Sequence, residues 1–396
     1  MRFAGIDVAA ERHYVAIVDE TGAVLQKPTA VSEEATGYRQ LRELLGNPED
    51  CLVAMEATGH YWRNLFTFLA GEGFSIALLN PLRTRRFAEE DLARTKTDAI
   101  DALGIARFAA QKRPAPTALP EPAVEQLREL VRLREQTVQQ LGDRVRHLHQ
   151  AVDLTFPEFT RYVRGLDTEL ATAILSRYPT AALLGRASVK KLAMLCFDGR
   201  RRIGATLALA LIGAAKISVG QHHADPYQLQ VRYACADIVT LRQRARDLER
   251  DIERKLDAHE VGKLLTTIQG IGPLTAACII GETGDPARFR NAAALASYVG
   301  VVPRLHQSGK RSFSGRVAIP LGNARLRRAL WMPVLVAVRL NPWLRAYYWR
   351  LRRAGKRPKV AMIACMHKLL AAVYSVAKHR RPFVVKIPLS DTGQAE

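Results

Sequence analysis

The sequence predicts an α/β domain at the N-terminus, a helical coiled-coil linker and a mainly α-helical C-terminal domain. Three observations support this. Short apolar runs alternate with helical spacing up to residue 113, a heptad pattern begins at Val124, and a Gly-Ile-Gly-Pro turn at residues 270–273 separates two apolar helical segments. A chain of 396 residues also exceeds the usual size of one hydrophobic core. We therefore expect domains at residues 1–113, 121–258 and 259–390.

The N-terminal domain has the pattern of three short strands followed by alternating helices and strands. Strands are expected at residues 3–8, 13–19 and 23–27, where tight turns favour an antiparallel meander. The elements expected next are a helix at 33–45, a strand at 52–56, a helix at 61–71, a strand at 74–79 and a helix that ends near residue 111. A proline-rich stretch then marks the domain boundary. This order is that of a ribonuclease-H-like fold, in which the first and fourth strands lie side by side.

Four carboxylates stand out in this domain because of where they fall. Asp7 and Glu56 each end a short apolar strand, and Asp98 and Asp101 lie three residues apart on one face of a helix. If the first and fourth strands are neighbours, Asp7 and Glu56 lie together and the helix brings the other two over them. Carboxylate oxygens are the ligands that Mg²⁺ prefers, with Mn²⁺ as an alternative. A single Asp is more often a solvated surface residue, so it is the combined pattern that favours a metal site.

The charge distribution indicates that the C-terminal region binds a polyanion. The formal net charge is +21, and residues 288–386 contain 22 Lys and Arg with no Asp or Glu. Aromatic residues lie among these cations, which suits contacts with bases or sugars. They are Trp331, Trp343, Tyr347, Tyr348 and Trp349. Nucleic acid is favoured over a membrane surface as the partner, and the segment has no lipidation signal.

Cysteine usage and hydropathy restrict the class of protein further. The five cysteines are scattered and lack the close pairs of a zinc site or a disulfide framework, so we expect reduced, mostly buried thiols. No uninterrupted apolar run of about 18 residues occurs, and Asp7 interrupts the first apolar segment. These observations predict a cytoplasmic protein with no membrane span and no export signal.

A heptad pattern follows the proline-rich boundary. Its core positions hold Val124, Leu127, Val131, Val138, Leu141, Val145, Leu148 and Val152. Valine and leucine at alternate core positions favour a two-stranded parallel coiled coil. Residues 238–252 repeat the spacing, so the two helices pair within one chain or between chains, with packed core helices as the alternative. Residues 155–236 form a helical insertion in which Arg200 to Arg202 either touch nucleic acid or are a solvated charge run.

Gly270 and Gly272 lie where one apolar helical segment ends and the next begins. This arrangement is that of a helix-hairpin-helix, in which glycines let backbone amides converge on a phosphate. A plain helical turn is the alternative.

Residues 300–328 combine hydroxyls, glycines and cations on what we expect to be a mobile loop ahead of a helix. The hydroxyls belong to Ser308, Ser312 and Ser314. The cations expected to contact nucleic acid are Lys310, Arg311, Arg316, Arg325, Arg327 and Arg328. Guanidinium groups can stabilise the charge that develops when a serine attacks a phosphate. Each serine taken alone is more often a turn residue or a phosphate hydrogen-bond donor.

Together these motifs resemble the DEDD insertion-sequence transposases related to the Piv DNA invertase. The resemblance rests on Asp7, Glu56, residues 97–102, the heptads, and residues 270–273, 307–309 and 322–327, and it covers roughly residues 1–112 and 260–380. It implies a RuvC-like domain and a separate transposase domain, joined by the coiled coil, whose acids and serine form a composite active site.

The same resemblance implies particular residues and partners. By motif position the magnesium ligands are Asp7, Glu56, Asp98 and Asp101. The nucleophile that forms a phosphoserine link to DNA is Ser308, with Ser312 and Ser314 as alternatives. Many members of the family are guided by a bridge RNA, so the implied partners are DNA, a bridge RNA and further copies of the chain in a dimer or tetramer.

Two other functions compete with this interpretation. A hydrolytic RuvC-like structure-specific endonuclease would cut DNA with the four acids and water alone. A non-catalytic nucleic-acid-binding protein would carry the acids without using them. The serine segment argues against the first, and the presence of all four acids argues against the second.

Overall fold

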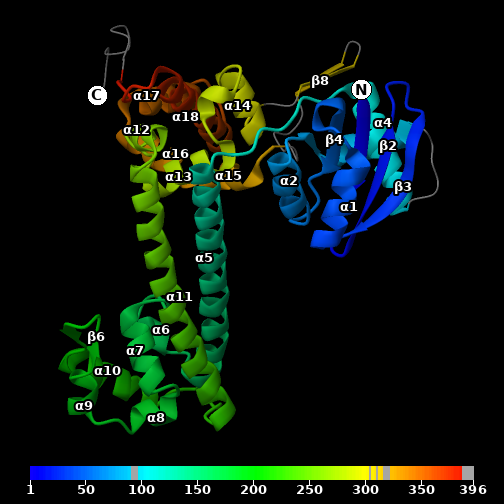
Figure 1. Cartoon of the computed structure of the whole chain (residues 1–396). Coiled ribbons are helices and arrows are strands. Elements are labelled where there is room, and N and C mark those ends of the chain that lie inside the picture. The colour runs from blue at the N-terminus through cyan, green and yellow to red at the C-terminus, as the bar shows by residue number, and fades with distance from the viewer. Residues whose placement is uncertain (91–96, 303–304, 309–310, 315–321, 386–396) are drawn as a thin grey trace. The chain divides into compact units, whose positions relative to one another are not determined.

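A computed structural model of the chain describes residues 1–90, 97–302, 305–308, 311–314 and 322–385. The chain divides into two compact units, Met1–Pro120 and Glu121–Glu396, and each is described by itself (Figure 1). The division falls within the proline-rich stretch that separates the α/β segment from the heptads.

Unit 1 is built on a five-stranded mixed sheet with the order β3-β2-β1-β4-β5 (Figure 1). The strands are β1 (Arg2–Asp7), β2 (Arg12–Val18), β3 (Val24–Ser32), β4 (Cys51–Glu56) and β5 (Ser75–Leu79). The first three strands pair antiparallel, whereas β4 pairs parallel with both β1 and β5. The predicted meander is confirmed, as is the prediction that the first and fourth strands are neighbours.

Helices cover both faces of this sheet. They are α1 (Ala35–Leu45), η1 (Pro48–Asp50), α2 (Trp62–Gly71), α3 (Pro81–Glu90) and α4 (Asp98–Lys112). Successive residues along β1 point to opposite faces. Ile6 therefore packs in a cluster with residues of α1 and α2, while Phe3 packs in a second cluster with residues of α4. The result is a three-layer unit, and the predicted α/β class of this domain is confirmed.

Two elements of unit 1 differ from expectation. Strand β3 continues through Pro28 to Ser32, because it is an edge strand, where a residue without an N–H is tolerated. Helix α3 was not predicted, since residues 81–90 are mostly polar and charged. Pro81 begins this helix, and the Asn80 side chain accepts a hydrogen bond from Leu82 N at 2.9 Å.

Unit 2 contains two long helices, α5 (Pro122–Thr155) and α11 (Asp225–Asp257), which lie side by side (Figure 1). Their contacts join low residue numbers on one helix to high numbers on the other: Lys255 Nζ lies 2.7 Å from Gln126 Oε1, and Arg144 Nε lies 3.1 Å from Asp237 Oδ2. The helices therefore pair antiparallel within one chain. The parallel arrangement favoured by the heptads is wrong for this pair, because the intervening residues return the chain to the end at which α5 finishes.

The insertion between these helices forms a small core together with the adjacent ends of α5 and α11. Its elements are α6 (Phe159–Tyr162), α7 (Glu169–Arg177), α8 (Ala181–Gly185), α9 (Val189–Ala193), β6 (Cys196–Phe197), β7 (Arg201–Arg202) and α10 (Ala205–Lys216). Phe156, Phe159 and Leu211 are fully buried there, against Cys235 of α11. Arg201 and Arg202 are exposed on β7, and Arg201 pairs with Asp198 at 3.3 Å.

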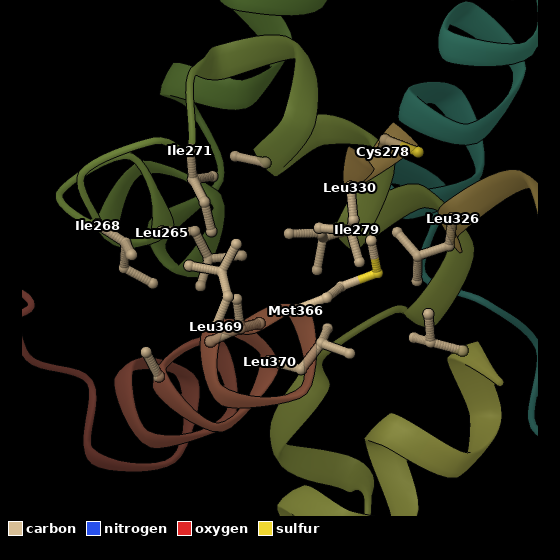
Figure 2. Packing of buried hydrophobic residues seen from close by; sticks show 14 of the residues in the cluster. Leu265, Ile268, Ile271, Cys278, Ile279, Leu326, Leu330, Met366, Leu369 and Leu370 are labelled. Atoms are coloured by element: carbon tan, nitrogen blue, oxygen red, sulfur yellow. The ribbon is translucent and has the colours of Figure 1, made fainter. Parts of the chain in front are cut away.

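The described residues in the C-terminal part of unit 2 are mainly helical, with one hairpin. Its elements are α12 (Glu260–Leu265), α13 (Pro273–Thr283), η2 (Pro286–Arg288), α14 (Ala292–Val299), β8 (Leu305–Ser308), β9 (Arg311–Ser314), α15 (Ala324–Ala329), α16 (Trp331–Leu340), α17 (Pro342–Arg353) and α18 (Pro358–His379). Figure 2 shows how Leu265 of α12, Leu369 of α18 and Leu330, between α15 and α16, meet in one core. Leu127 of α5 and Leu256 of α11 belong to the same core, so the helix pair and the C-terminal helices fold together.

Helix α18 is the one helix among the described residues with the length and apolar composition to cross a membrane. In this structure 56% of its most apolar stretch is buried. Met366, Leu369 and Leu370 lie at the centre of the core in Figure 2, so α18 has the surroundings of a core helix. The expectation for the cysteines is confirmed: all five thiols are free, and four of them are buried.

Candidate functional site

Asp7 and Glu56 lie at the carboxyl ends of two adjacent parallel strands. In the β1–β4 ladder Ile6 is opposite Met55, and the next residue on each strand is one of the two acids. The Thr84 hydroxyl of α3 donates a hydrogen bond to Glu56 Oε1, and Thr58 Oγ1 lies 3.5 Å from Glu56 Oε2. Strand pairing thus brings the two acids to one edge of the sheet, and a threonine from an unpredicted helix orients the second.

Gly5 determines how closely α4 approaches β1. A Cβ atom on Gly5 would lie 2.2 Å from Ala106 N and 2.3 Å from Ala102 O, so the helix backbone rests directly on the strand. Only glycine leaves room for this contact. Thr97 caps α4 by accepting a hydrogen bond from Ile100 N at 3.3 Å, which places Asp98 and Asp101 in the first turn. Ala102, which follows Asp101, is therefore packed against Gly5, two residues before Asp7.

The four predicted metal ligands are brought to neighbouring elements but not to one point. Glu56, Asp7 and Asp101 are half-buried, and Asp98 is exposed. Within the described ranges no three His, Cys, Asp or Glu side chains lie close enough to hold one metal ion. The carboxylate oxygens match the ligand preference of a hard divalent cation. The residue types therefore fit such an ion.

A second polar cluster in unit 1 was not predicted. His13 is fully buried, and its Nδ1 accepts a hydrogen bond from Ala9 N at 3.4 Å, so Nε2 carries the proton and donates to Glu33. Tyr38 and Asn64 also donate to Glu33, at 2.8 and 3.3 Å. Burial would raise the pKa of Glu33, but these three donors hold that pKa below its ordinary value. The cluster fixes the turn that follows β1.

The segment that carries Ser308 forms a two-stranded hairpin where a mobile loop was expected. Strands β8 and β9 pair antiparallel, with Ser308 opposite Arg311, Gln307 opposite Ser312 and Leu305 opposite Ser314. Ser308 is therefore the serine whose partner across the ladder is a basic residue. The predicted contacts Lys310 and Arg316 lie outside the described residues.

The two ends of this hairpin segment are held together at its base. Gly300, which ends α14 with φ of 81°, lies against Gly322, which has φ of 102°. A Cβ on Gly322 would be 2.8 Å from the Gly300 backbone, and Asn323 N donates to Tyr298 O at 2.8 Å. The chain consequently leaves the helical core and returns to it at the same place.

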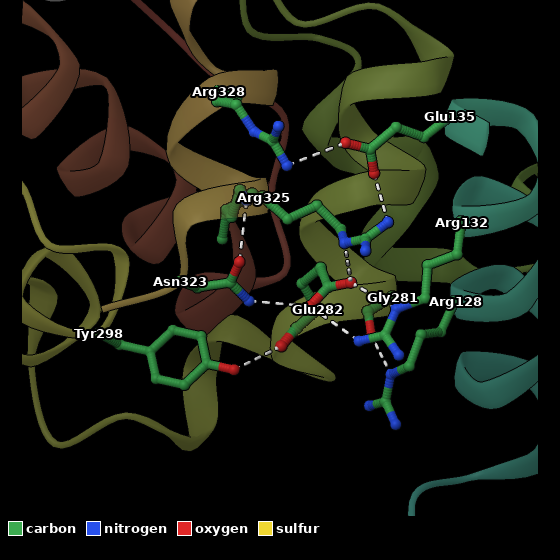
Figure 3. Close-up of polar contacts among 10 residues, drawn as sticks. Arg128, Arg132, Glu135, Gly281, Glu282, Tyr298, Asn323, Arg325 and Arg328 are labelled. Carbon is green, nitrogen blue, oxygen red and sulfur yellow. Dashed lines mark hydrogen bonds and ion pairs between the residues drawn. The ribbon is translucent and has the colours of Figure 1, made fainter. Parts of the chain in front are cut away.

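A buried carboxylate on α13 organises this base (Figure 3). The Glu282 side chain is 6% exposed, and Arg132 Nε lies 3.0 Å from its Oε1. Asn323 Nδ2 donates to Glu282 Oε2 at 2.8 Å, and Tyr298 Oη donates to the Glu282 carbonyl oxygen at 2.9 Å. Burial would raise the pKa of Glu282, but the Arg132 and Asn323 hydrogen bonds and the charges of Arg132 and Arg325 hold it below its ordinary value.

Sequence inspection did not single out Glu282, although a signal was present. It is a lone acid in the apolar segment 276–283, and a buried acid needs a paired cation. Thr84 gave no comparable signal, because its contact with Glu56 depends on the fold.

The predicted nucleic-acid contacts on α15 have protein partners in the structure. Arg325 pairs with Glu135 and lies 3.6 Å from Glu282, and Arg327 donates to Val299 O at 2.9 Å. The Arg328 side chain is 72% exposed and lies 3.2 Å from Glu135. Arg328 is therefore the most accessible of the three, while Arg325 and Arg327 brace the hairpin base.

The two glycines of the predicted helix-hairpin-helix have different surroundings. Gly270 has φ of 100°, and a Cβ there would be 2.8 Å from Pro333 O and 2.6 Å from Ala337 Cβ, so it packs against α16. Gly272 is exposed at the start of α13. Of the two, Gly272 is the more exposed.

Paired acids at the ends of adjacent parallel strands, joined in one chain to a strongly basic helical unit, are what an enzyme acting on nucleic acid strands requires. Comparison with known proteins gives the class. A family model for transposases of the DEDD IS110 type matches residues 4–157, and a model described as the transposase IS116/IS110/IS902 family matches residues 262–349. Together the two matches cover more than half of the chain.

Individual relatives are similar over nearly the whole length. The IS117 mini-circle protein of Streptomyces coelicolor, which is named as a transposase, is 29% identical over 96% of this chain and 95% of its own length. A protein of insertion element IS116 from Streptomyces clavuligerus is 26% identical over 99% and 98%. The pilin gene-inverting protein of Moraxella bovis is 28% identical over 85% and 82%.

The chain belongs to the IS110 family of insertion-element transposases, and the predicted resemblance is confirmed. Its similarity to a gene-inverting protein extends the class to DNA recombination. Membership of a DEDD family implies use of a divalent metal ion in general.

Proposed function

We propose that this protein cleaves and rejoins DNA strands with Ser308 as nucleophile and with Mg²⁺, or Mn²⁺ in its place, held by Asp7, Glu56, Asp98 and Asp101. The observation that carries the proposal is the pairing of β1 with β4, which sets Asp7 and Glu56 side by side in a member of the DEDD transposases. In this proposal unit 1 is a ribonuclease-H-like domain of the RuvC type, an assignment supported by its sheet order.

The chemistry assigned to Ser308 balances without a further reactant. Its hydroxyl oxygen forms a bond to the phosphorus while the bond from phosphorus to one bridging oxygen of the strand breaks; the hydroxyl proton is lost and the departing oxygen gains one. A strand hydroxyl then attacks the phosphoserine, restores the serine and forms the new phosphodiester. A bound divalent cation would neutralise charge on the phosphate.

The choice of Ser308 over its neighbours is supported by the register of the hairpin. Ser308 pairs with Arg311 at the end of the β8–β9 ladder, so its partner across the ladder is a residue with a guanidinium group. Arginine can stabilise the additional charge of a pentacoordinate phosphate. Ser312 and Ser314 are opposite Gln307 and Leu305, which bring no charge.

A guide RNA, an oligomer and a cytoplasmic location complete the proposal. The guide RNA is supported by the family resemblance and by the acid-free stretch at 288–386. A dimer or tetramer is supported by apolar side chains exposed on the helix pair, such as Leu133, Val138 and Val239. Light scattering at several protein concentrations tests the oligomer.

The decisive experiment looks for a covalent protein–DNA adduct that survives denaturation. Purified protein, Mg²⁺ and DNA spanning the ends of the insertion element are incubated with and without RNA from its non-coding ends. We expect an adduct in the wild type and in Ser312→Ala and Ser314→Ala, but not in Ser308→Ala or Asp7→Asn. Cleavage by Ser308→Ala without an adduct would establish a hydrolytic endonuclease instead. Binding with no cleavage in any divalent metal, unaffected by Asp7→Ala, would establish a non-catalytic binding protein.

A further inference from the structure

A cavity of about 540 Å³ lies in unit 2 among α16, α17 and α18. Trp331, Tyr347, Ile363 and His367 line it, Lys359 is the cationic side chain in its wall, and Val301 adjoins it from the start of the hairpin segment. The cavity falls within the size range of small-ligand sites, about 300–1,000 Å³. None of these residues has a role in the proposed cleavage.

The aromatic walls of the cavity are only partly used by the core. Trp331 and Tyr347 pack against the C-terminal core but remain half-buried, and His367 and Ile363 are half-buried as well. Exposed aromatic surface in a concave site is suited to a flat, apolar ligand group. An aliphatic chain would also fill such a space, so the shape alone does not identify the ligand.

The charges around the cavity indicate which class of ligand it binds. Lys368 Nζ lies 4.6 Å from the centre of the Tyr347 ring, and Arg350 Cζ lies 5.1 Å from it. Lys359 is exposed, and residues 288–386 contain no acid that would neutralise these cations. The ligand therefore combines a flat aromatic group with adjoining negative charge, which describes a nucleotide.

We propose that this cavity holds an unstacked nucleobase of the DNA or RNA substrate, stacked on Trp331 or Tyr347, with Lys359 and Lys368 near the adjoining phosphates. Base-on-aromatic stacking is tolerant of sequence, and a cationic surround anchors the strand. Because Val301 directly follows Gly300, the cavity adjoins the base of the hairpin, and the base it holds belongs to a strand that passes that point. This inference rests on the proposed function for the nature of the ligand.

The test compares two single-stranded probes of equal length and charge, one of deoxythymidine and one of abasic deoxyribose phosphate. Binding of each labelled probe to the full-length protein is measured by fluorescence anisotropy. We expect the wild type to prefer the base-bearing probe, and Trp331→Ala to weaken binding of that probe by about tenfold with little effect on the abasic one. Trp331→Phe keeps a stacking surface and should retain most of the preference.

Trp349→Ala is the matched control, because Trp349 lies on α17 in the same basic region, is 52% exposed and does not line the cavity. An equal loss in Trp349→Ala and Trp331→Ala would overturn the inference, as would a Trp331→Ala protein that keeps its preference for bases. The thermal midpoint of each variant shows whether it is folded. If Trp331→Ala is not folded, Tyr347→Ala, which removes the other stacking surface, takes its place and should likewise weaken binding of the base-bearing probe. The adduct assay is read in parallel: an adduct in the wild type with no base preference removes the cavity proposal alone, whereas no adduct under any condition removes the proposed function.

Discussion

Gly5 of β1 and Ala102 of α4 are in backbone contact, so close that a Cβ atom on Gly5 would lie 2.3 Å from the Ala102 carbonyl oxygen. The position of the helix that carries Asp98 and Asp101 therefore depends on the absence of one methyl group. Two acids distant in sequence from Asp7 are held near it by packing of the main chain, with no charged group required.

Replacing Gly5 by alanine should displace α4. The added methyl group meets two backbone atoms that cannot rotate away, so we expect unit 1 to lose about 1–3 kcal/mol of unfolding free energy. Metal-dependent cleavage should fall with it. Urea unfolding followed by circular dichroism measures the first effect and strand cleavage the second.

Gly104→Ala is the control for that experiment. Gly104 lies on the same helix with open space around it, so alanine there should raise stability by about 0.5–1 kcal/mol. If Gly5→Ala were as stable and as active as Gly104→Ala, the close approach would have no importance for the acids.

Thr84→Val should separate the orientation of Glu56 from the folding of unit 1. The substitution keeps the volume of a side chain that is 6% exposed and removes the hydroxyl that donates to Glu56 Oε1. We expect a stability loss of about 1 kcal/mol, a higher Mg²⁺ concentration for half-maximal cleavage and unchanged DNA affinity. Thr84→Ser retains the donor and should behave as wild type. Equal metal dependence in the valine and serine variants would contradict a role for Thr84.

The acid sensitivity of unit 2 should depend on Glu282. Its pKa lies below the ordinary value near 4.5, so the folded state binds fewer protons than the unfolded state. The stability from this group is fully present above about pH 4.5 and is lost as the pH falls through the lower, folded-state pKa. Glu282→Gln should cost about 1–3 kcal/mol at neutral pH, and the difference from wild type should shrink in acid.

Denaturant unfolding over a series of pH values measures this difference. Glu253, an exposed acid on α11, provides the control substitution Glu253→Gln, which removes one carboxylate outside the Glu282 network. A constant gap between Glu282→Gln and wild type from neutral to acid pH would show that the charge of Glu282 contributes nothing.

Asn323→Asp should be more harmful than Asn323→Ala at neutral pH. Aspartate still caps α15, but it places a second carboxylate where Asn323 Nδ2 now lies 2.8 Å from Glu282 Oε2. Alanine loses the cap, worth about 1 kcal/mol, without adding a charge. Thermal unfolding should show the extra loss in the aspartate variant disappearing at acid pH, where one carboxylate takes up a proton. An aspartate variant that is more stable than the alanine variant at neutral pH would contradict the role assigned to the Glu282 network.

The arginines of α15 should differ in role, with Arg328 contacting nucleic acid and Arg325 stabilising the fold. Arg328→Gln should leave stability nearly unchanged and lower the slope of log affinity against log salt concentration by about one, because its side chain is 72% exposed. Arg325→Gln should instead lower stability, because Arg325 lies between Glu135 and Glu282. Salt titrations of DNA binding, together with unfolding curves, distinguish the two. Equal salt slopes for wild type and Arg328→Gln would remove Arg328 from the nucleic-acid contacts.

The sheet was predictable because its information is local. Each strand of unit 1 is a short apolar run between turn residues, and the first and fourth strands follow from the order of the elements. The ends of those strands placed Asp7 and Glu56 correctly on one edge. Helix α3 was missed because a polar helix has little hydrophobic periodicity. Thr84 lies on this helix and was therefore missed as well, since its partner Glu56 is 28 residues away in the sequence.

Other features depend on how distant segments meet. The heptads correctly indicated that α5 needs a partner helix, but they favoured a parallel pair. The pair is antiparallel, because the path of the chain between α5 and α11 decides the direction and the valine and leucine core positions do not. The serine segment has few apolar residues, which suggested a loop, yet its register pairs Ser308 with Arg311 in a hairpin. The Glu282 network joins residues 132, 282 and 323, which no local pattern could connect.

The chain runs out along α5 and back along α11, and the two ends of the intervening insertion meet. His222 N donates to Leu154 O at 3.3 Å, and a Cβ on Gly220 would lie 2.6 Å from Thr155 O. The core of the insertion includes Leu148 and Val152 of α5 and Val231 and Cys235 of α11, so replacing residues 156–224 by a tight turn would expose apolar side chains on both helices. Another small domain could stand there if it covered these side chains, while the opposite ends of both helices stay packed in the C-terminal core.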